Sequence, residues 1–217
     1  MSFDNFELRR DFNLSEERLE KLKEERRTPQ EYREEIRQNL EEAYRLALDF
    51  AKSPEGWLVF MGETGCGKTH LAAAIVNYRY QNKQPALFVV VPDFLDHLRS
   101  TFTPKSEVSY DHIFERVKTA PLLVLDDFGE QSTTAWAREK LYQVINYRYN
   151  ARLATVITTR YSLQEILEEI ESAISSRLAD PKISTPFNIM ASDYRTDLGS
   201  GQSARKKYPR GRKGRWD

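Results

Sequence analysis

The chain has 217 residues, 40% hydrophobic and 30% charged, which suits one α/β domain with its own core and excludes a disordered chain. Its formal net charge is zero, it contains no apolar run near the roughly 20 residues that span a bilayer, and its N-terminus lacks the features of a signal peptide. One cysteine excludes an internal disulfide, so we expect a cytoplasmic protein.

Residues 1–54 are predicted to form a charged helical segment. Ser15 is the expected N-cap of a first helix that ends near Thr28. Thr28-Pro29-Gln30-Glu31 then forms a capping box with proline at the first helical position, which opens a second helix. Helical spacing of its apolar residues favours packing on the body of the domain over a partner-binding face. These residues are Tyr32, Ile36, Leu40, Ala43, Tyr44, Ala47 and Ala51.

Strands and helices are predicted to alternate over residues 55–195. The expected strands are Trp57–Met61, Ala86–Val91, Leu122–Leu125, Ala154–Thr159 and Ile183–Met190. The first expected helix follows the glycines at 62–67 and ends at about Asn82. Later helices are expected over Phe94–Ser100, Tyr110–Lys118 and Ala135–Asn150, and another begins at a capping box at Ser162. Thr101–Ser109 is expected to be a loop. Short apolar strands between helices predict a parallel five-stranded sheet with helices on both faces.

A phosphate-binding loop follows the first expected strand. Its residues, Gly62-Glu63-Thr64-Gly65-Cys66-Gly67-Lys68-Thr69, match Gly-x-x-x-x-Gly-Lys-Thr and precede an expected helix. Glycines let backbone N–H groups face phosphate oxygens, and the helix N-terminus adds partial positive charge. Lys68 is expected to reach the β- and γ-phosphates, and Thr69 to ligate Mg²⁺. The motif therefore predicts binding of ATP with magnesium.

Two acidic residues end the expected strand Leu122–Leu125. Asp126 and Asp127 would lie at the carboxyl edge of the sheet, where open α/β sheets bind ligands. We expect Asp126 to complete the magnesium site with Thr69, and Asp127 to orient or deprotonate the attacking water. Without the phosphate loop, such a pair would indicate a turn or a helix cap.

These motifs resemble the AAA+ ATPase domain of the DnaC/IstB-type family, which contains bacterial helicase loaders and transposition helper ATPases. The resemblance is carried by Phe3-Asp4-Asn5-Phe6, by Gly67 to Ile75 and by Leu125-Asp126-Asp127-Phe128-Gly129. It implies a P-loop NTPase core over residues 55–195, and it adds His70 to the nucleotide-binding residues. Few residues follow Met190 and they lack a helical apolar pattern, so we expect no helical lid.

The resemblance suggests three further site residues. Ser175-Ser176-Arg177-Leu178 is similar to a segment that supplies an arginine finger to a neighbouring subunit, which implies a homo-oligomer; a surface salt bridge of Arg177 is the alternative. Either Thr159 or Arg160 would sense the γ-phosphate. Arg195 would act as a second sensor or be an ordinary surface residue.

Cys66 lies at a helix N-terminus near Lys68, and both features favour a thiolate. We interpret it mainly as a small loop residue whose backbone N–H matters.

Two features suggest contact with nucleic acid. Seven Lys or Arg and one acid lie between Arg205 and Asp217, within a basic tail, residues 196–217, that would bind an anionic partner or be solvated and disordered. Tyr147-Arg148-Tyr149 could stack on single-stranded nucleic acid, although packing of one helix face is favoured.

The expected function is that of an AAA+ ATPase that loads or remodels a replicative helicase. One alternative is a transposition helper that binds DNA and a transposase. Another is a nucleotide-gated binding module with negligible turnover, because Asp127 stands where most AAA+ proteins have glutamate. The expected partners are other copies of the chain, a helicase or transposase, and single-stranded or duplex DNA, with ATP and Mg²⁺ as cofactors and no membrane.

Overall fold

The structure is a computed structural model that describes residues 1–8, 14, 16–100, 110–129, 134–170 and 172–194. Four of the sequence predictions lie outside these residues: the cap at Ser15, the loop over 101–109, the sensor Arg195 and the tail over 196–217.

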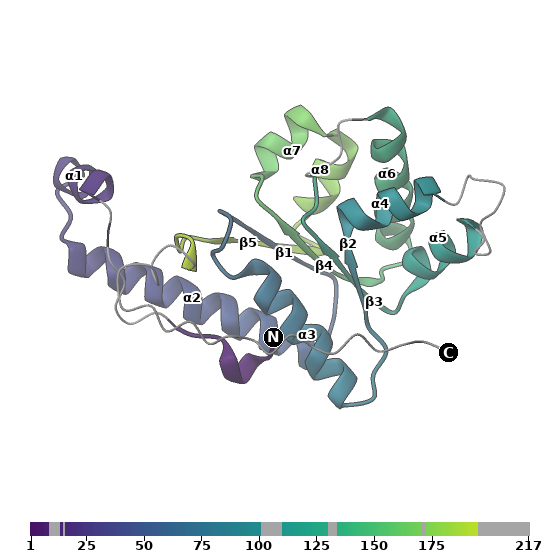
Figure 1. Ribbon diagram of the computed structural model, residues 1–217, viewed down its shortest axis with the longest axis horizontal. Helices are drawn as coiled ribbons and strands as arrows, with labels where there is room; N and C mark the ends of the chain where they lie inside the picture. Colours follow the sequence, from purple (N-terminus) through teal and green to yellow (C-terminus); the bar gives the residue numbers. More distant parts are fainter. Residues whose placement is uncertain (9–13, 15, 101–109, 130–133, 171, 195–217) are drawn as a thin grey trace, which may run out of the picture.

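A five-stranded parallel sheet forms the centre of the molecule (Figure 1), which confirms the predicted fold class. Its strands stand in the order β2-β3-β4-β1-β5, and every pair is parallel. The strands are β1 (Trp57–Gly62), β2 (Leu87–Val90), β3 (Leu122–Asp126), β4 (Ala154–Thr159) and β5 (Ser184–Ile189).

Nine helical elements surround the sheet in the described part of the chain. They are η1 (Phe3–Asn5), α1 (Glu16–Glu24), α2 (Pro29–Lys52), α3 (Lys68–Gln81), α4 (Val91–Ser100), α5 (Tyr110–Thr119), α6 (Ala135–Asn150), α7 (Leu163–Glu169) and α8 (Ser172–Leu178). Two differences from the sequence predictions stand out. Val91 begins α4 instead of ending a strand, and α8 was not predicted.

Alternating side chains of the strands divide the core into two clusters, one on each face of the sheet. Trp57 and Val59 of β1 pack with residues of α4 to α8. Leu58 and Phe60 of the same strand pack with residues of α2 and α3. Figure 1 shows the same division, with α2 and α3 on one side of the sheet and α6, α7 and α8 on the other. Burial on both faces therefore explains the apolar runs of β1 and β3.

Helix α2 packs on the domain as its apolar pattern predicts. Its capping box forms, since the Thr28 hydroxyl accepts from the Glu31 N–H at 3.2 Å and the Glu31 carboxylate accepts from the Thr28 N–H at 2.8 Å. Its buried residues join the cluster that also holds α3; they are Ile36, Leu40, Ala43, Ala47 and Ala51. Among the described helices, none has the length and apolar character needed to cross a membrane.

Arg148 is fully buried and ties α6 to the sheet. Its Nε donates to the Thr155 hydroxyl at 2.9 Å, and its terminal nitrogens donate to the carbonyls of Lys118, Ala120 and Ala154 at 3.1, 2.7 and 2.6 Å. Burial lowers the pKa of Arg148 to about 10. Arg148 therefore packs in the core, although Tyr147 beside it is 39% exposed.

Candidate nucleotide-binding site

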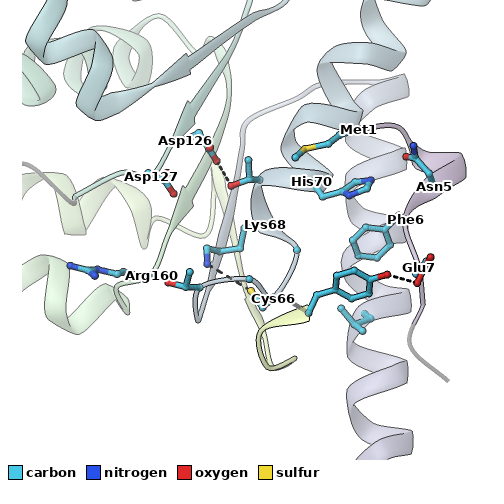
Figure 2. A pocket seen from close by; sticks show the side chains of 16 residues that line it. Met1, Asn5, Phe6, Glu7, Cys66, Lys68, His70, Asp126, Asp127 and Arg160 are labelled. Atoms are coloured by element: carbon cyan, nitrogen blue, oxygen red, sulfur yellow. Dashed lines mark hydrogen bonds between the residues drawn. The ribbon is translucent and has the colours of Figure 1, made fainter. Parts of the chain in front are cut away.

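A cavity of about 560 Å³ lies over the phosphate loop at the carboxyl edge of the sheet. Residues 64–70, Asp126, Asp127 and Arg160 line it, as do Phe6, Glu7 and Tyr194 from the two ends of the described chain. Figure 2 shows Asp126 and Asp127 on one side of Lys68, and Phe6 and Glu7 on the other. The cavity therefore has an acidic end and an aromatic end, with the loop between them.

Glycine is required at two points of the phosphate loop. Gly62 has φ +136, and a Cβ there would lie 2.4 Å from the Ile189 carbonyl oxygen. Gly65 has φ +76, and a Cβ there would lie 1.9 Å from Asp193 Oδ1. A Cβ at Gly62 would displace the loop from β5, and the φ of Gly65 is one that larger residues rarely adopt.

Lys68 reaches back across the loop from the first turn of α3. It is 7% exposed, and its ammonium donates to the carbonyls of Gly62 and Glu63, both at 2.7 Å. These bonds fix the ammonium against the loop, beside the N–H groups that open α3. Positive charge and helix N-terminus thus coincide, which is the arrangement that binds phosphate.

Asp126 and Thr69 form the part of the site that suits magnesium. The Thr69 hydroxyl donates to Asp126 Oδ1 at 3.0 Å, and the Thr158 hydroxyl donates to the same oxygen at 2.6 Å. Burial raises the pKa of the Asp126 carboxyl, which is only 2% exposed; hydrogen bonds from Thr158 and Thr69 oppose this rise, and the charge of Asp127 adds to it.

The oxygen ligands near Thr69 fit Mg²⁺ bound together with a nucleotide. The described residues contain no cluster of three His, Cys, Asp or Glu side chains that could hold a metal by itself. Mg²⁺ is usually bound through one or two carboxylates plus substrate phosphates. The Thr69 hydroxyl and the Asp126 carboxylate provide the protein's share of such a site.

Asp127 also lines the cavity, and its backbone adopts φ +55, which is uncommon outside glycine. Its N–H donates to the Thr158 hydroxyl at 3.1 Å. Thr158 thus contacts both aspartates, yet we did not identify it as a site residue from the sequence.

Of the two candidate γ-phosphate sensors, Arg160 lines the cavity and Thr159 does not. Thr159 is fully buried, and its hydroxyl donates to the Phe128 carbonyl at 2.8 Å instead of lining the cavity. Arg160 does line the cavity, and its Nη2 donates to the Tyr161 hydroxyl at 2.9 Å. Of the two candidate sensors, only Arg160 stands at the cavity.

Cys66 is buried within the phosphate loop. Its side chain is 2% exposed, and Lys68 Nζ lies 3.7 Å from its sulfur. Burial raises the pKa of the Cys66 thiol despite the opposing effect of Lys68. The two features that favour a thiolate are therefore outweighed by desolvation of the sulfur.

The aromatic end of the cavity is formed where residues 1–7 pack against α3. The rings of Phe6 and His70 meet edge to face with centroids 5.3 Å apart. His70 Nε2 lies 3.0 Å from the Ser2 carbonyl, and Asn77 donates to the Met1 carbonyl. His70 lines the cavity, and it also contacts the N-terminal residues.

Arg177 lies on α8 and does not line this cavity. Its terminal nitrogens donate to the Ala173 carbonyl and to Asn146 Oδ1, both at 2.6 Å. Its guanidinium carbon stands 5.3 and 5.4 Å from the ring centroids of Tyr142 and Tyr149. These partners of Arg177 are a carbonyl, an amide and two aromatic rings, and none of them is a carboxylate.

A parallel sheet with a phosphate loop after β1 and an aspartate at the end of β3 defines a P-loop nucleotide-binding protein with the AAA+ fold. The family of IstB-like ATP binding proteins matches residues 9–180, and the chain belongs to this family.

Curated relatives resemble only part of the chain. It is 31% identical over 110 residues to the replicative helicase loader DnaI of Bacillus subtilis, which covers 50% of this chain and 34% of DnaI. It is 26% identical over 120 residues to the replicative helicase loader DnaC of Escherichia coli, which covers 55% of this chain and 49% of DnaC. The matches thus span between a third and a half of these relatives.

Solved structures agree on the fold. A crystal structure of the DnaC helicase loader superposes with a TM-score of 0.59 at 28% identity, covering 69% of this chain and 89% of that one. A crystal structure of DnaI gives a TM-score of 0.62 at 21% identity, covering 88% and 89%.

Proposed function

We propose that the chain is a magnesium-dependent ATPase whose nucleotide state controls its association with a replicative helicase or a related DNA-bound complex. The observation that carries this proposal is the convergence of Lys68, Thr69, Asp126 and Asp127 at one cavity over a phosphate loop. Membership of a family of ATP-binding proteins supports ATP as the ligand.

In the proposed mechanism, each charged side chain has one task. Lys68 holds the β- and γ-phosphates, and Thr69 with Asp126 would hold Mg²⁺, which neutralises charge developing on the phosphoryl oxygens. Asp127 orients the attacking water and accepts its proton. Arg160 senses the γ-phosphate from the rim of the cavity.

Assembly would bring a second cation to the phosphates. We propose that Arg177 of one copy reaches the nucleotide of its neighbour, because it lies outside its own cavity and its described hydrogen bonds go to a carbonyl and an amide, not to a carboxylate. A planar guanidinium spreads its charge over several phosphate oxygens. Arg195, which lies outside the described residues, remains a proposed second sensor.

The proposed partner-binding part is residues 1–54. The apolar face of α2 is buried against the domain, so α1 and the charged face of α2 are the surfaces left for a partner. A loader should therefore co-purify with a hexameric helicase through these residues. Replacing the exposed Lys21 and Lys23 of α1 by glutamate tests this while leaving Phe6 and Glu7 in the cavity, and unaltered co-purification would contradict it.

A transposition helper is the second candidate, favoured by the IstB-like family itself. Such a protein should bind duplex DNA with steep salt dependence, since phosphate contacts release counterions. Binding should be lost on removal of Arg205–Asp217. A salt-independent interaction, or one that survives this truncation, would argue against the helper.

The ATPase proposal is tested at two residues. Lys68→Ala should abolish tight Mg-ATP binding, and affinity within a few-fold of the wild type would remove Lys68 from the site. Asp127→Asn should suppress turnover while sparing binding. A wild-type rate that is negligible and unchanged by Asp127→Asn would instead support a nucleotide-gated module without turnover.

A further inference from the structure

The aromatic end of the cavity is placed to receive the base of the nucleotide. Lys68 and Thr69 fix the phosphates near Asp126, so the rest of the nucleotide must extend toward the other end (Figure 2). Phe6 and His70 provide ring surfaces there. This step rests on the proposed function, because it takes the phosphate loop as the site of the phosphates.

One carboxylate lines that end of the cavity. Glu7 Oε2 accepts a hydrogen bond from the Tyr194 hydroxyl at 2.6 Å. A carboxylate only accepts hydrogen bonds, and its two oxygens offer about four acceptor positions. Glu7 can therefore accept from Tyr194 and from a second donor at the same time.

Tyr194 fixes the position of Glu7 relative to the phosphate loop. Its backbone N–H donates to the Gly65 carbonyl at 3.1 Å, and Asp193 beside it fills the space that a Cβ at Gly65 would need. The Tyr194 side chain then reaches across to Glu7. A carboxylate from the N-terminal segment is thus held at a set place by a residue anchored to the loop.

We propose that Glu7 selects a 6-aminopurine nucleotide and that Tyr194 is the positioning residue for Glu7. Adenine presents an amino group at its sixth position, which donates to a carboxylate. Guanine presents a carbonyl oxygen there, which a carboxylate repels. The proposal therefore places the sixth position of the base against Glu7, and not the first and second positions, where guanine has N–H donors. Selectivity arises from both the attractive contact with one base and the unfavourable contact with the other.

The test compares ADP and GDP carrying the same fluorescent group on the ribose, so that only the base differs. The wild type should bind the adenine nucleotide about tenfold more tightly, the effect of one hydrogen bond to a charged group in a partly exposed site. Glu7→Gln should bring the ratio to about twofold or less, since its amide can turn a donor toward the guanine oxygen.

Two further variants separate positioning from a structural effect. Tyr194→Phe should reduce the ratio, and Glu7→Gln should reduce it no further in the Tyr194→Phe background, because the two residues act as one pair. Tyr80→Phe, at an 81% exposed tyrosine of α3 outside the cavity, should leave the ratio unchanged. A ratio of affinities within one variant is insensitive to partial unfolding of that variant.

Three results would overturn the proposal. Tight binding of both nucleotides by the wild type with equal affinity would refute base selection and leave the ATPase proposal intact. An unchanged ratio in Glu7→Gln would remove Glu7 from recognition. Binding of neither nucleotide by the wild type would refute the proposed function and the selection together.

Discussion

Replacing Asp126 by asparagine should raise the stability of the ligand-free fold while abolishing its response to magnesium. Burial raises the pKa of Asp126, so the folded chain holds this proton to a higher pH than the unfolded chain, whose Asp pKa is about 3.9. The charged carboxylate therefore destabilises the fold at neutral pH, and this cost is absent below the unfolded pKa. Asparagine removes the charge and keeps an oxygen that accepts from Thr69 and Thr158.

Magnesium should change the effect of ATP on the melting temperature of the wild type but not of Asp126→Asn. At a hundred times the dissociation constant, a ligand stabilises the fold that binds it by about 2.7 kcal/mol. For a chain of this length this raises the melting temperature by about 5–10 °C. We expect the wild type to show this shift with Mg-ATP and less of it with ATP and EDTA. Asp126→Asn should respond to the two conditions equally.

Differential scanning calorimetry over a pH series tests both parts of this reasoning. The ligand-free variant should melt above the wild type near neutral pH, and the gap should close as the pH approaches about 4. A ligand-free variant that melts below the wild type would refute the argument from the buried charge. A full magnesium-dependent shift in the variant would show that Asp126 lies outside the magnesium site.

Three other substitutions or reactions test the remaining assignments. Arg177→Ala should spare ATP binding but suppress the turnover that rises with protein concentration, whereas undiminished turnover at high concentration would exclude Arg177 from the mechanism. Arg148→Met should lower the free energy of unfolding in urea by about 3 kcal/mol, because it leaves buried carbonyls without donors; a loss below 1 kcal/mol would contradict this. Cys66 should react with iodoacetamide much more slowly in the folded chain than in urea, because burial raises its pKa, and equal rates would contradict its burial.

The phosphate end of the site could be predicted because its determinants are local in sequence. The loop from Gly62 to Thr69 contains its own turn glycines, cation and hydroxyl, and it is flanked by the strand and helix that it needs. Asp126 ends a strand that is apolar throughout. Only the hydrogen bond between Thr69 and Asp126 depends on the fold. Even this contact could be expected, because both residues follow the carboxyl ends of parallel strands, where open α/β sheets bind their ligands.

Thr158 was missed because its role depends on strand pairing. β3 pairs with β4 so that Leu125 stands opposite Ile157, and the next residues along are Asp126 and Thr158. Nothing in either segment alone gives this register. A signal was present, however: Thr158 and Thr159 are polar residues at the carboxyl end of a strand, which is the edge of the sheet where ligands bind. Only the first of them turns its hydroxyl to the aspartates.

Helix α8 was missed because it is seven residues long and its sequence shows no capping-box pattern. Its serines are weak helix formers, and a short helix takes most of its stability from packing. Here Ile174 and Leu178 are buried in the core shared with α6. The contacts that surround Arg177 are tertiary as well, since Asn146, Tyr142 and Tyr149 all belong to α6.

Both ends of the described chain close on the phosphate loop, and this arrangement limits how a nucleotide can act on the rest of the protein. A Cβ at Gly67 would lie 3.1 Å from the Phe6 ring, and Tyr194 bonds to Gly65. A ligand shifts a conformation only through contacts that differ between the states. Any rearrangement of the loop by phosphate must therefore be accommodated by residues 1–8 or by the segment after β5. The N-terminal helices follow residues 1–8 in the sequence, so a rearrangement of the loop has a direct route to them through the contacts of Phe6.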